Sequence, residues 1–374
     1  MRRTRPVPRL GKAAHRSLAA GLLALLLPGC VGAPPPARPA IAPSGETTAY
    51  LFVYFTGSGL ERETIHFALS EGNDALHWRP LNGGRPVLES TRGTRGLRDP
   101  FILRSAQGDR FFLLATDLSA ARTGLDKATS EGSHHLEIWE STDLVHWGEQ
   151  RHVRVNLPRA GMTWAPEASW DPAGGRYVVY WASTLFADDA RTQADGSGPQ
   201  MLFATTRDFR TFSAPQVWFK AADRPELDAG KGLIDATVLH DGGQFFRFTK
   251  ATEAVGCPSG DIILERSATL AATGESGGWT LVDRCIGRDA GTPEVEGPAI
   301  LRTNPGDRSG YRYILYVDRF RDEGLMPLAT QSLEGDIGWT TPASFALPAG
   351  ARHGTVLPIT SAERDALLAR WGQG

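Results

Sequence analysis

The sequence predicts an all-β protein, a five-bladed β-propeller closed by pairing N- and C-terminal strands in one blade. One observation is a segment that occurs four times and has the pattern of a β-hairpin, with two apolar or aromatic runs joined by a Gly-rich turn. A second segment follows each hairpin, with an apolar run, a polar turn and an aromatic residue. The hairpins begin at Arg98, Trp164, Ile234 and Glu296, and the second segments end at Trp147, Phe212, Trp279 and Trp339. Four four-stranded units are therefore expected in succession.

The fifth unit is divided between the two ends of the chain. Residues 50–57 and 65–78 have the pattern of the last three strands of a unit whose first strand is missing. RHGTVLPIT, residues 352–360, supplies a polar start and a short apolar run at the other end. Sharing one blade between the ends closes the ring and removes an open sheet edge. The following SAERDALLARW predicts a short capping helix with Ser361 as its N-cap and Glu363 in its first turn.

Residues 1–30 have the pattern of a lipoprotein signal peptide. A basic start is followed by an apolar run over residues 18–27, which is well short of a membrane span. The run ends in LPGC, which resembles a bacterial lipobox whose Cys30 would carry lipid; an ordinary secretory signal with a chance cysteine is the alternative. Residues 31–46 form a Pro-rich tether, and residues 47–374 would form the propeller with its short helix.

These features predict an exported lipoprotein of the cell envelope, bound to the membrane through its lipid. In a Gram-negative cell we expect the outer membrane or periplasm, because Val31 is not the aspartate that retains lipoproteins at the inner membrane. A formal net charge of −2 with interspersed charges offers no basic patch, so nucleic acid is not an expected partner. We expect a monomer.

Two further cysteines, Cys257 and Cys285, remain after Cys30. In an exported protein this pair indicates a disulfide rather than a metal site, because no histidine or other cysteine lies at ligand spacing around it. Two buried free thiols are the alternative. A disulfide would join the two open ends of the outer hairpin in one blade.

Propeller geometry brings distant residues together, because the first strand of every blade lines the central channel. The residues that begin these strands should converge on one mouth: Asp99, the group from Trp164 to Glu167, Asp235, Glu296 and His353. The second strands return to the same face, and their ends should rim the pocket with Thr56, Asp117, Ser183, Lys250, Asp318 and Arg319. The loops at 117–134 and 184–200 would wall it and bring His134 and His135 nearby.

Three acids in one pocket favour acid and base chemistry. Like charges in a partly desolvated cleft push their pKa values apart, so that one carboxyl group can stay protonated while another stays ionised. Two carboxyl groups flanking a glycosidic bond are the usual means of glycoside hydrolysis. The alternative is that the three acids only pair with arginines such as Arg98 and Arg319 to hold the channel together.

The ordered set RDP, WAP, IDA and EGP at successive blade starts, followed by HG, resembles glycoside hydrolase family 43 over the whole chain after the tether. The resemblance implies an inverting enzyme that releases arabinofuranosyl, xylosyl or galactofuranosyl units from a polysaccharide or oligosaccharide. It implies Asp99 as general base, Asp235 as the carboxylate that orients and tunes the acid, and Glu296 as general acid. It also implies that His353 faces a bound structural cation, calcium or sodium, with no cofactor required for the chemistry.

The sequence departs from the family pattern at Arg98, before the base, and at Ala236, where proline is frequent. Because of these two departures, the resemblance does not determine which sugar the enzyme would release. RDP also occurs in retaining fructosidases, but their Asn-Asp-Pro and Glu-Cys segments are absent from this sequence. A catalytically silent, carbohydrate-binding surface lipoprotein on the same propeller is the second function class.

Four more residues are candidates for substrate binding: Trp164, Glu167, Asp117 and Arg319. Trp164 could stack on a sugar ring or pack within the blade, and both interpretations stay open. The aromatic residues at the outer ends of the units, such as Trp78 and Trp147, are expected between blades. Glu294, two residues before Glu296, is expected in a connection between blades, solvated or paired with a loop arginine.

Overall fold

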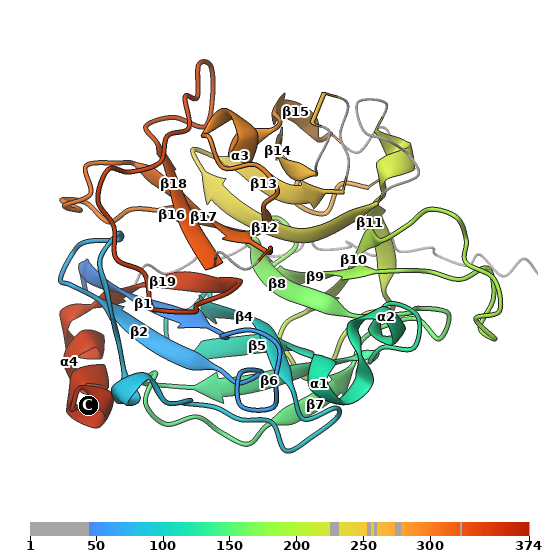
Figure 1. Cartoon of the computed structure of the whole chain (residues 1–374), viewed down its shortest axis with the longest axis horizontal. Coiled ribbons are helices and arrows are strands. Elements are labelled where there is room, and N and C mark those ends of the chain that lie inside the picture. The colour runs from blue at the N-terminus through green and yellow to red at the C-terminus, as the bar shows by residue number, and fades with distance from the viewer. Residues whose placement is uncertain are drawn as a thin grey trace, which may run out of the picture. The chain divides into compact units, whose positions relative to one another are not determined.

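The computed structural model describes residues 45–224, 232–252, 256–257, 260–273, 278–321 and 324–373. Residues 1–44 lie outside this part, and with them the expected signal peptide, Cys30 and nearly all of the tether. Five antiparallel sheets account for the described strands and are the blades of the predicted propeller, which is confirmed (Figure 1). None of the described helices is long and apolar enough to cross a membrane.

Blades 1 to 3 each contain four strands, in the following order from the channel outward. Blade 1 contains β19 (Gly354–Thr360), β1 (Thr47–Tyr54), β2 (His66–Ser70) and β3 (Trp78–Pro80). Blade 2 contains β4 (Leu97–Arg104), β5 (Phe111–Asp117), β6 (His135–Ser141) and β7 (Arg151–Arg154). Blade 3 contains β8 (Trp164–Asp171), β9 (Arg176–Ser183), β10 (Gln200–Thr206) and β11 (Gln216–Phe219).

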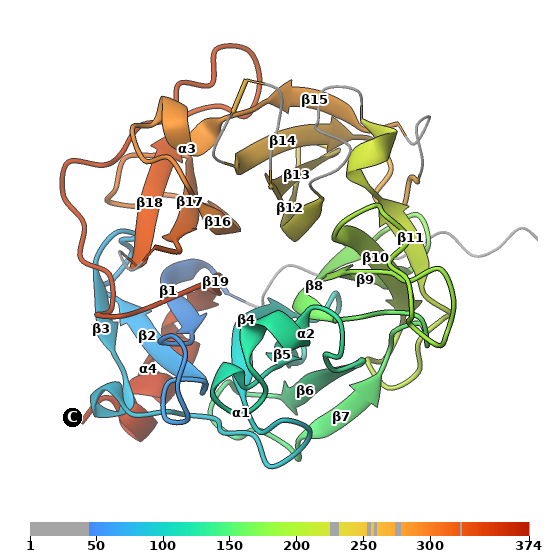
Figure 2. The ribbon, with the colours of Figure 1, turned by 45° about the vertical axis from the view of Figure 1, so that its right-hand side comes forward.

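The remaining blades complete the ring seen in Figure 2. Blade 4 contains β12 (Leu233–Asp241), β13 (Gln244–Ala251), β14 (Asp261–Ser267) and β15 (Thr280–Asp283). Blade 5 contains β16 (Glu296–Arg302), β17 (Tyr313–Arg319) and β18 (Gly324–Thr330). The helical segments are α1 (Ala120–Thr123), α2 (Leu125–Ala128), α3 (Ile286–Asp289), α4 (Ser361–Trp371) and the 3-10 turns η1 (Asn82–Gly84) and η2 (Ala221–Asp223).

Blade 1 is shared between the two ends of the propeller, as expected. Strand β19 pairs antiparallel with β1 from Tyr54, opposite Gly354, to Thr47, opposite Thr360. Helix α4 follows directly, but its N-cap is Thr360 and not the predicted Ser361. The Thr360 side chain accepts a hydrogen bond from the backbone N–H of Glu363, and the Glu363 carboxylate accepts one from the backbone N–H of Thr360. This capping box fixes the helix start one residue earlier than the pattern predicts.

Blade 5 corrects a second expectation, because its described part has three strands instead of four. After β18, the described residues pair with this strand only through an isolated bridge between Ala329 and Thr340. The segment between them is rich in Gly, Ser and Asp, which favour turns over a continuous ladder. Trp339 still inserts between blades, as its counterparts do.

Aromatic contacts between neighbouring blades form much of the core. The tryptophans at the outer ends of the repeats are each in edge-on contact with a ring of the adjacent blade, as expected. The pairs are Trp78 with Tyr316, Trp147 with Phe67, Trp279 with Trp218, and Trp339 with Phe248. The blades therefore hold one another in register around the channel.

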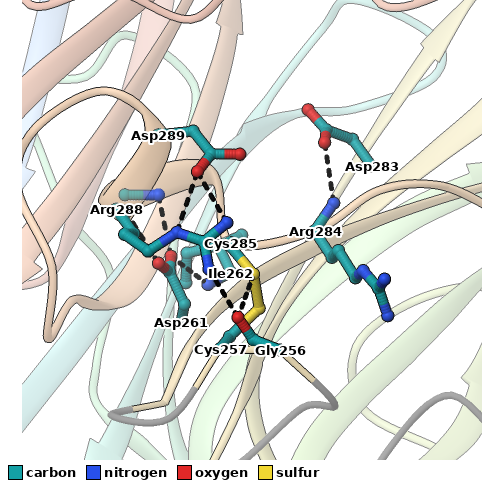
Figure 3. Close-up of a disulfide and its surroundings, with 10 residues drawn as sticks. Gly256, Cys257, Asp261, Ile262, Asp283, Arg284, Cys285, Arg288 and Asp289 are labelled. Atoms are coloured by element: carbon teal, nitrogen blue, oxygen red, sulfur yellow. Dashed lines mark hydrogen bonds and ion pairs between the residues drawn. A yellow bond between two sulfur atoms is a disulfide. The ribbon is translucent and has the colours of Figure 1, made fainter.

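A disulfide joins Cys257 and Cys285 in blade 4, with the two Cα atoms 5.5 Å apart. Cys257 precedes β14 and Cys285 follows β15, so antiparallel pairing brings the ends of this outer hairpin together. Beside the disulfide, the carboxylate of Asp261 accepts hydrogen bonds from the backbone N–H groups of Gly287 and Arg288, each at 2.8 Å (Figure 3). The start of α3 is thus held against the same hairpin.

Candidate active site

The inner strands of blades 2 to 5 share an irregularity at the channel mouth. Each has a register shift against its second strand at this point. One residue in each shift has a left-handed backbone: Asp99 (φ 49), Ala165 (φ 47), Asp235 (φ 52) and Gly297 (φ 54). A bulge of this kind turns a side chain away from the regular alternation of a strand, and such strain is typical of functional sites.

The shared irregularity corrects the expected equivalence of the three acids. Glu296 pairs with Asp318 just as Arg98 pairs with Thr116 and Ile234 pairs with Lys250. Glu296 therefore lies one position before the one that Asp99 and Asp235 occupy in their blades, and Gly297 takes that position. The sequence already carries this offset, because the acid is the second residue of RDP and IDA but the first residue of EGP.

A pocket of about 400 Å³ opens at this end of the channel. The three acids line it together with His353, as expected, and so does Trp164. Part of the wall comes from the predicted loop at 117–134, but none of the lining residues comes from the loop at 184–200. The lining residues are Phe55, Arg98, Asp99, Leu118, Leu125, Asp126, Thr129, Trp164, Ile234, Asp235, Glu296, Asp318, Arg352 and His353.

Asp99 is held in its ionised form. Its Oδ2 accepts a hydrogen bond of 2.9 Å from the Thr116 hydroxyl, and its Oδ1 lies 3.4 Å from Nδ1 of His353. Burial alone would raise the pKa of Asp99, but the hydrogen bond and charge of His353, with Arg98 and Thr116, keep that pKa below its ordinary value. An ionised carboxylate at the pocket surface is suited to accept a proton from water.

Asp235 lies deeper, with 8% of its surface exposed, and touches the strand that carries Glu296. Its Oδ2 accepts a hydrogen bond of 3.1 Å from the backbone N–H of Gly297. Burial, with the charge of Asp99, raises the pKa of Asp235. A Cβ atom at Gly297 would lie 2.7 Å from the His353 ring, so only glycine fits between this aspartate and the histidine.

Glu296 is the acid whose protonated form the site favours. Burial, with the charges of Asp235 and Asp318, raises the pKa of Glu296 to about 8. Glu294 lies instead in an ion pair with Arg321, with an Oε1–Nη2 distance of 3.1 Å and 35% of its side chain exposed, as expected for a residue between blades. Of the two glutamates, only Glu296 lines the pocket.

The closing strand brings one pocket residue that the sequence reasoning missed, Arg352. Its Nε lies 2.8 Å from both carboxylate oxygens of Asp318, and Asp318 also accepts a hydrogen bond from the backbone N–H of His353 at 3.1 Å. Blade 5 is thereby tied to blade 1 beside Glu296. The position of Arg352 directly before the HG pair is the signal that could have found it.

Several expected pocket residues lie elsewhere. Of the six residues predicted on the rim, only Asp318 lines the pocket. Asp117 is buried against Thr94, whose N–H and hydroxyl both donate to its Oδ1, and Arg319 ends β17 outside the lining. Glu167 is buried in its blade, where it accepts a hydrogen bond from Tyr180, and burial raises its pKa to about 8. The expectation that Asp117, Glu167 and Arg319 line the pocket is therefore wrong.

The expected histidines of the loop are also turned away from the pocket. His134 Nε2 lies 2.7 Å from the carbonyl oxygen of Ala160, and the ring of His135 stacks on His152. These contacts hold both rings against blade 2, so neither lines the pocket.

A structural cation near His353, bound directly or through water, stays a prediction. Nδ1 of His353 faces Asp99, and the hydrogen bond to Asp99 with the charges of Asp235 and Glu167 outweighs burial and raises the pKa of His353 to about 9. Among the described residues, three ligand atoms within bonding reach of one ion come together only in blade 2, away from His353.

A five-bladed propeller whose channel pocket is lined by carboxyl groups with pKa values displaced in opposite directions has the arrangement expected of a glycosidase of this fold. The family model described as a probable glycosyl hydrolase domain, related to glycoside hydrolase family 43, matches residues 45–365. The chain belongs to this family, which confirms the resemblance found in the sequence.

Relatives agree with this placement. An alpha-L-arabinofuranosidase of Bifidobacterium longum subsp. longum is 35% identical over 310 residues, which cover 75% of this chain and 28% of that protein. The chain thus spans little more than a quarter of the relative's length. An alpha-L-arabinanase of Cellvibrio cellulosa has the same fold, with a TM-score of 0.51, 15% identity, and coverage of 83% of this chain and 98% of that chain. An endo-1,4-beta-xylanase of Bacteroides thetaiotaomicron has a TM-score of 0.50 and 14% identity, covering 81% and 97%.

Proposed function

We propose that this chain is an inverting glycosidase that releases a furanosyl or pentosyl unit, with Asp99 as general base and Glu296 as general acid. One observation carries the proposal: two carboxyl groups line one pocket, and their pKa values are displaced in opposite directions. Near neutral pH one is ionised and the other holds a proton. An inverting hydrolysis needs this pair of states at the start of every turnover.

In the proposed reaction, Asp99 takes a proton from a water molecule while the water oxygen attacks the anomeric carbon. The bond from that carbon to the leaving oxygen breaks, and Glu296 gives its proton to the leaving oxygen. Asp235 orients the strand of Glu296 through Gly297 and, by its charge, helps to keep Glu296 protonated. Thr116 and His353 keep Asp99 ionised and in place.

For the released sugar, we propose an α-L-arabinofuranosyl unit in preference to a xylosyl or galactofuranosyl unit. The support is the name of the curated relative, which is 35% identical over most of this chain. Trp164 lines the pocket and offers an indole for the apolar face of a sugar ring. A pocket of about 400 Å³ holds one or two sugar units, which favours release from a chain end.

Two measurements test the proposal. Hydrolysis of aryl arabinofuranoside, xyloside and galactofuranoside should be fastest with the arabinofuranoside. Proton NMR during hydrolysis of the preferred natural linkage should show a first-formed sugar of opposite anomeric configuration. Retention, or a trapped glycosyl-enzyme, would refute the roles of Asp99 and Glu296. Binding of oligosaccharides without turnover of any substrate would favour the carbohydrate-binding alternative.

We also propose that the protein is a lipoprotein of the cell envelope, bound to the membrane through Cys30. The proposal rests on the sequence pattern around Cys30. An anchored glycosidase would act on oligosaccharides close to the cell. The Pro-rich tether would let the propeller stand away from the membrane surface.

A further inference from the structure

A second group of ionisable side chains lies on one face of blade 2, outside the pocket. Glu137 on β6 is directly opposite His152 on β7, and Ala115 on β5 is opposite Glu137. Asp117 lies two residues beyond Ala115, so the pleat places it on the same face. Asp117, Glu137 and His152 therefore meet from three neighbouring strands, and a ligand atom from each lies within 4.8 Å of the others.

Their contacts leave one carboxylate oxygen that accepts no hydrogen bond from the described residues. Nδ1 of His152 lies 2.5 Å from Oε1 of Glu137 and 4.0 Å from Oδ2 of Asp117. The second oxygen of Glu137 accepts a hydrogen bond from Gln150, and Oδ1 of Asp117 accepts two from Thr94. Within the described part of the chain, no hydrogen bond reaches Oδ2 of Asp117, although the side chain is only 2% exposed.

The group of Asp117, Glu137 and His152 also holds more negative than positive charge. The side chains of Asp117 and Glu137 are 2% and 0% exposed, and two carboxylates face a single imidazole. No lysine or arginine forms an ion pair with either acid among the residues that the structure describes. A buried carboxylate without a full partner is costly, and a divalent cation would supply the missing charge.

We propose that Asp117, Glu137 and His152 bind a divalent transition-metal cation of the Zn²⁺ type. One imidazole nitrogen and two carboxylate oxygens suit zinc, whereas calcium prefers six to eight oxygens. Zinc binds such atoms at about 2.0–2.2 Å, so tetrahedral neighbours lie about 3.3 Å apart. The observed separations of 2.5 and 4.0 Å fall on either side of that value, so a small rotation of His152 would complete the site.

The surroundings of Asp117, Glu137 and His152 fix the His152 ring and leave it accessible to solvent. The ring of His135 stacks on His152 with centroids 3.9 Å apart and an interplanar angle of 9°, which fixes the plane of the His152 ring. His152 is 27% exposed, so an ion and a fourth, water ligand can reach it from solvent. Asp117 ends β5, and the next residue, Leu118, lines the pocket. A bound ion would therefore fix the start of the pocket wall.

The test is zinc binding by tag-free protein after dialysis against a chelator. Isothermal titration with ZnCl₂ and metal analysis after gel filtration should give one Zn²⁺ per chain. Asp117→Asn and His152→Gln should each weaken binding at least about tenfold. His146→Gln is the matched control, because His146 forms a similar pair with Asp143 at 2.7 Å on the surface, and it should bind zinc as the wild type does.

Cobalt substitution gives a readout that needs no variant. Co²⁺ in the wild-type protein should show the strong visible absorption of a four-coordinate site, and added Zn²⁺ should remove it. A wild-type protein that takes up no zinc beyond the level of a buffer control would overturn the proposal. Zinc binding that His146→Gln abolishes, while Asp117→Asn and His152→Gln leave it unchanged, would overturn it as well.

Discussion

Replacing Glu296 by alanine should separate substrates by their leaving groups. Proton donation to the leaving oxygen contributes typically two to four powers of ten in rate, which corresponds to about 2.7 to 5.5 kcal/mol of transition-state stabilisation. Glu296→Ala should therefore lose roughly 10²- to 10⁴-fold in kcat/KM on natural linkages and alkyl glycosides. Aryl glycosides with nitrophenol leaving groups depart without a proton, so the loss on these substrates should be far smaller.

The pH profile gives a second measure of the same residue. Because a general acid works in its protonated form, activity should be present below the pKa of Glu296, which is about 8, and should fall as pH rises through that value. In Glu296→Ala this alkaline fall should vanish on aryl glycosides. The measurement is kcat/KM from pH 5 to 10 on one aryl and one alkyl substrate for both proteins.

Glu294→Ala is the matched control, since Glu294 lies two residues away and pairs with Arg321 outside the pocket. Glu294→Ala should change kcat/KM on either substrate by little, and its activity should still fall at alkaline pH as in the wild type. Equal damage to both substrate types in Glu296→Ala, or the greater damage in Glu294→Ala, would refute the reasoning.

Three further changes test the fold and the location. Gly297→Ala puts a left-handed backbone on alanine and a Cβ 2.7 Å from His353, so thermal unfolding should show a loss of at least roughly 1–2 kcal/mol; an unchanged Tm would contradict the close contact. Cys257→Ser with Cys285→Ser removes a bridge between cysteines 28 residues apart and should cost about 3 to 4 kcal/mol in urea unfolding, whereas two titratable thiols in the unreduced wild-type protein would exclude the disulfide. Cys30→Ser should release the protein from the membrane fraction, and unchanged sedimentation with membranes would argue against lipid on Cys30.

The fold could be predicted because the propeller repeats itself in the chain. Apolar runs, turns and terminal aromatics recur at similar spacing, and the unpaired first strand at residues 352–360 made closure of the ring the natural solution. The missing strand in blade 5 could not be predicted from Trp339, because a tryptophan between blades does not require a strand around it. The helix start at Thr360 instead of Ser361 depended on which hydroxyl reaches Glu363, and both residues suit an N-cap.

The order of the strands was enough to predict which residues begin the inner strands, but not every side chain that lines the pocket. Asp99, Asp235, Glu296 and His353 line one cavity because they begin inner strands. The register shifts decide which side chains turn inward, and they arise from paired backbones that a sequence does not display. Asp117 also carries a carboxylate at a strand end, but its neighbour Thr94 comes from another loop and draws it into the blade.

The pairing of β19 with β1 has a consequence for how the enzyme is made. His353 and Arg352 lie next to the strand that closes the ring, while Asp99 and Glu296 belong to blades that are synthesised earlier. Blade 1 can form only when Tyr54 pairs with Gly354, and contacts between residues so distant in the sequence come late in folding. A chain whose blade 1 has not yet closed would thus hold all three acids without the histidine beside Asp99. Hydrolysis should begin only when the ring closes, so that maturation itself decides when activity starts.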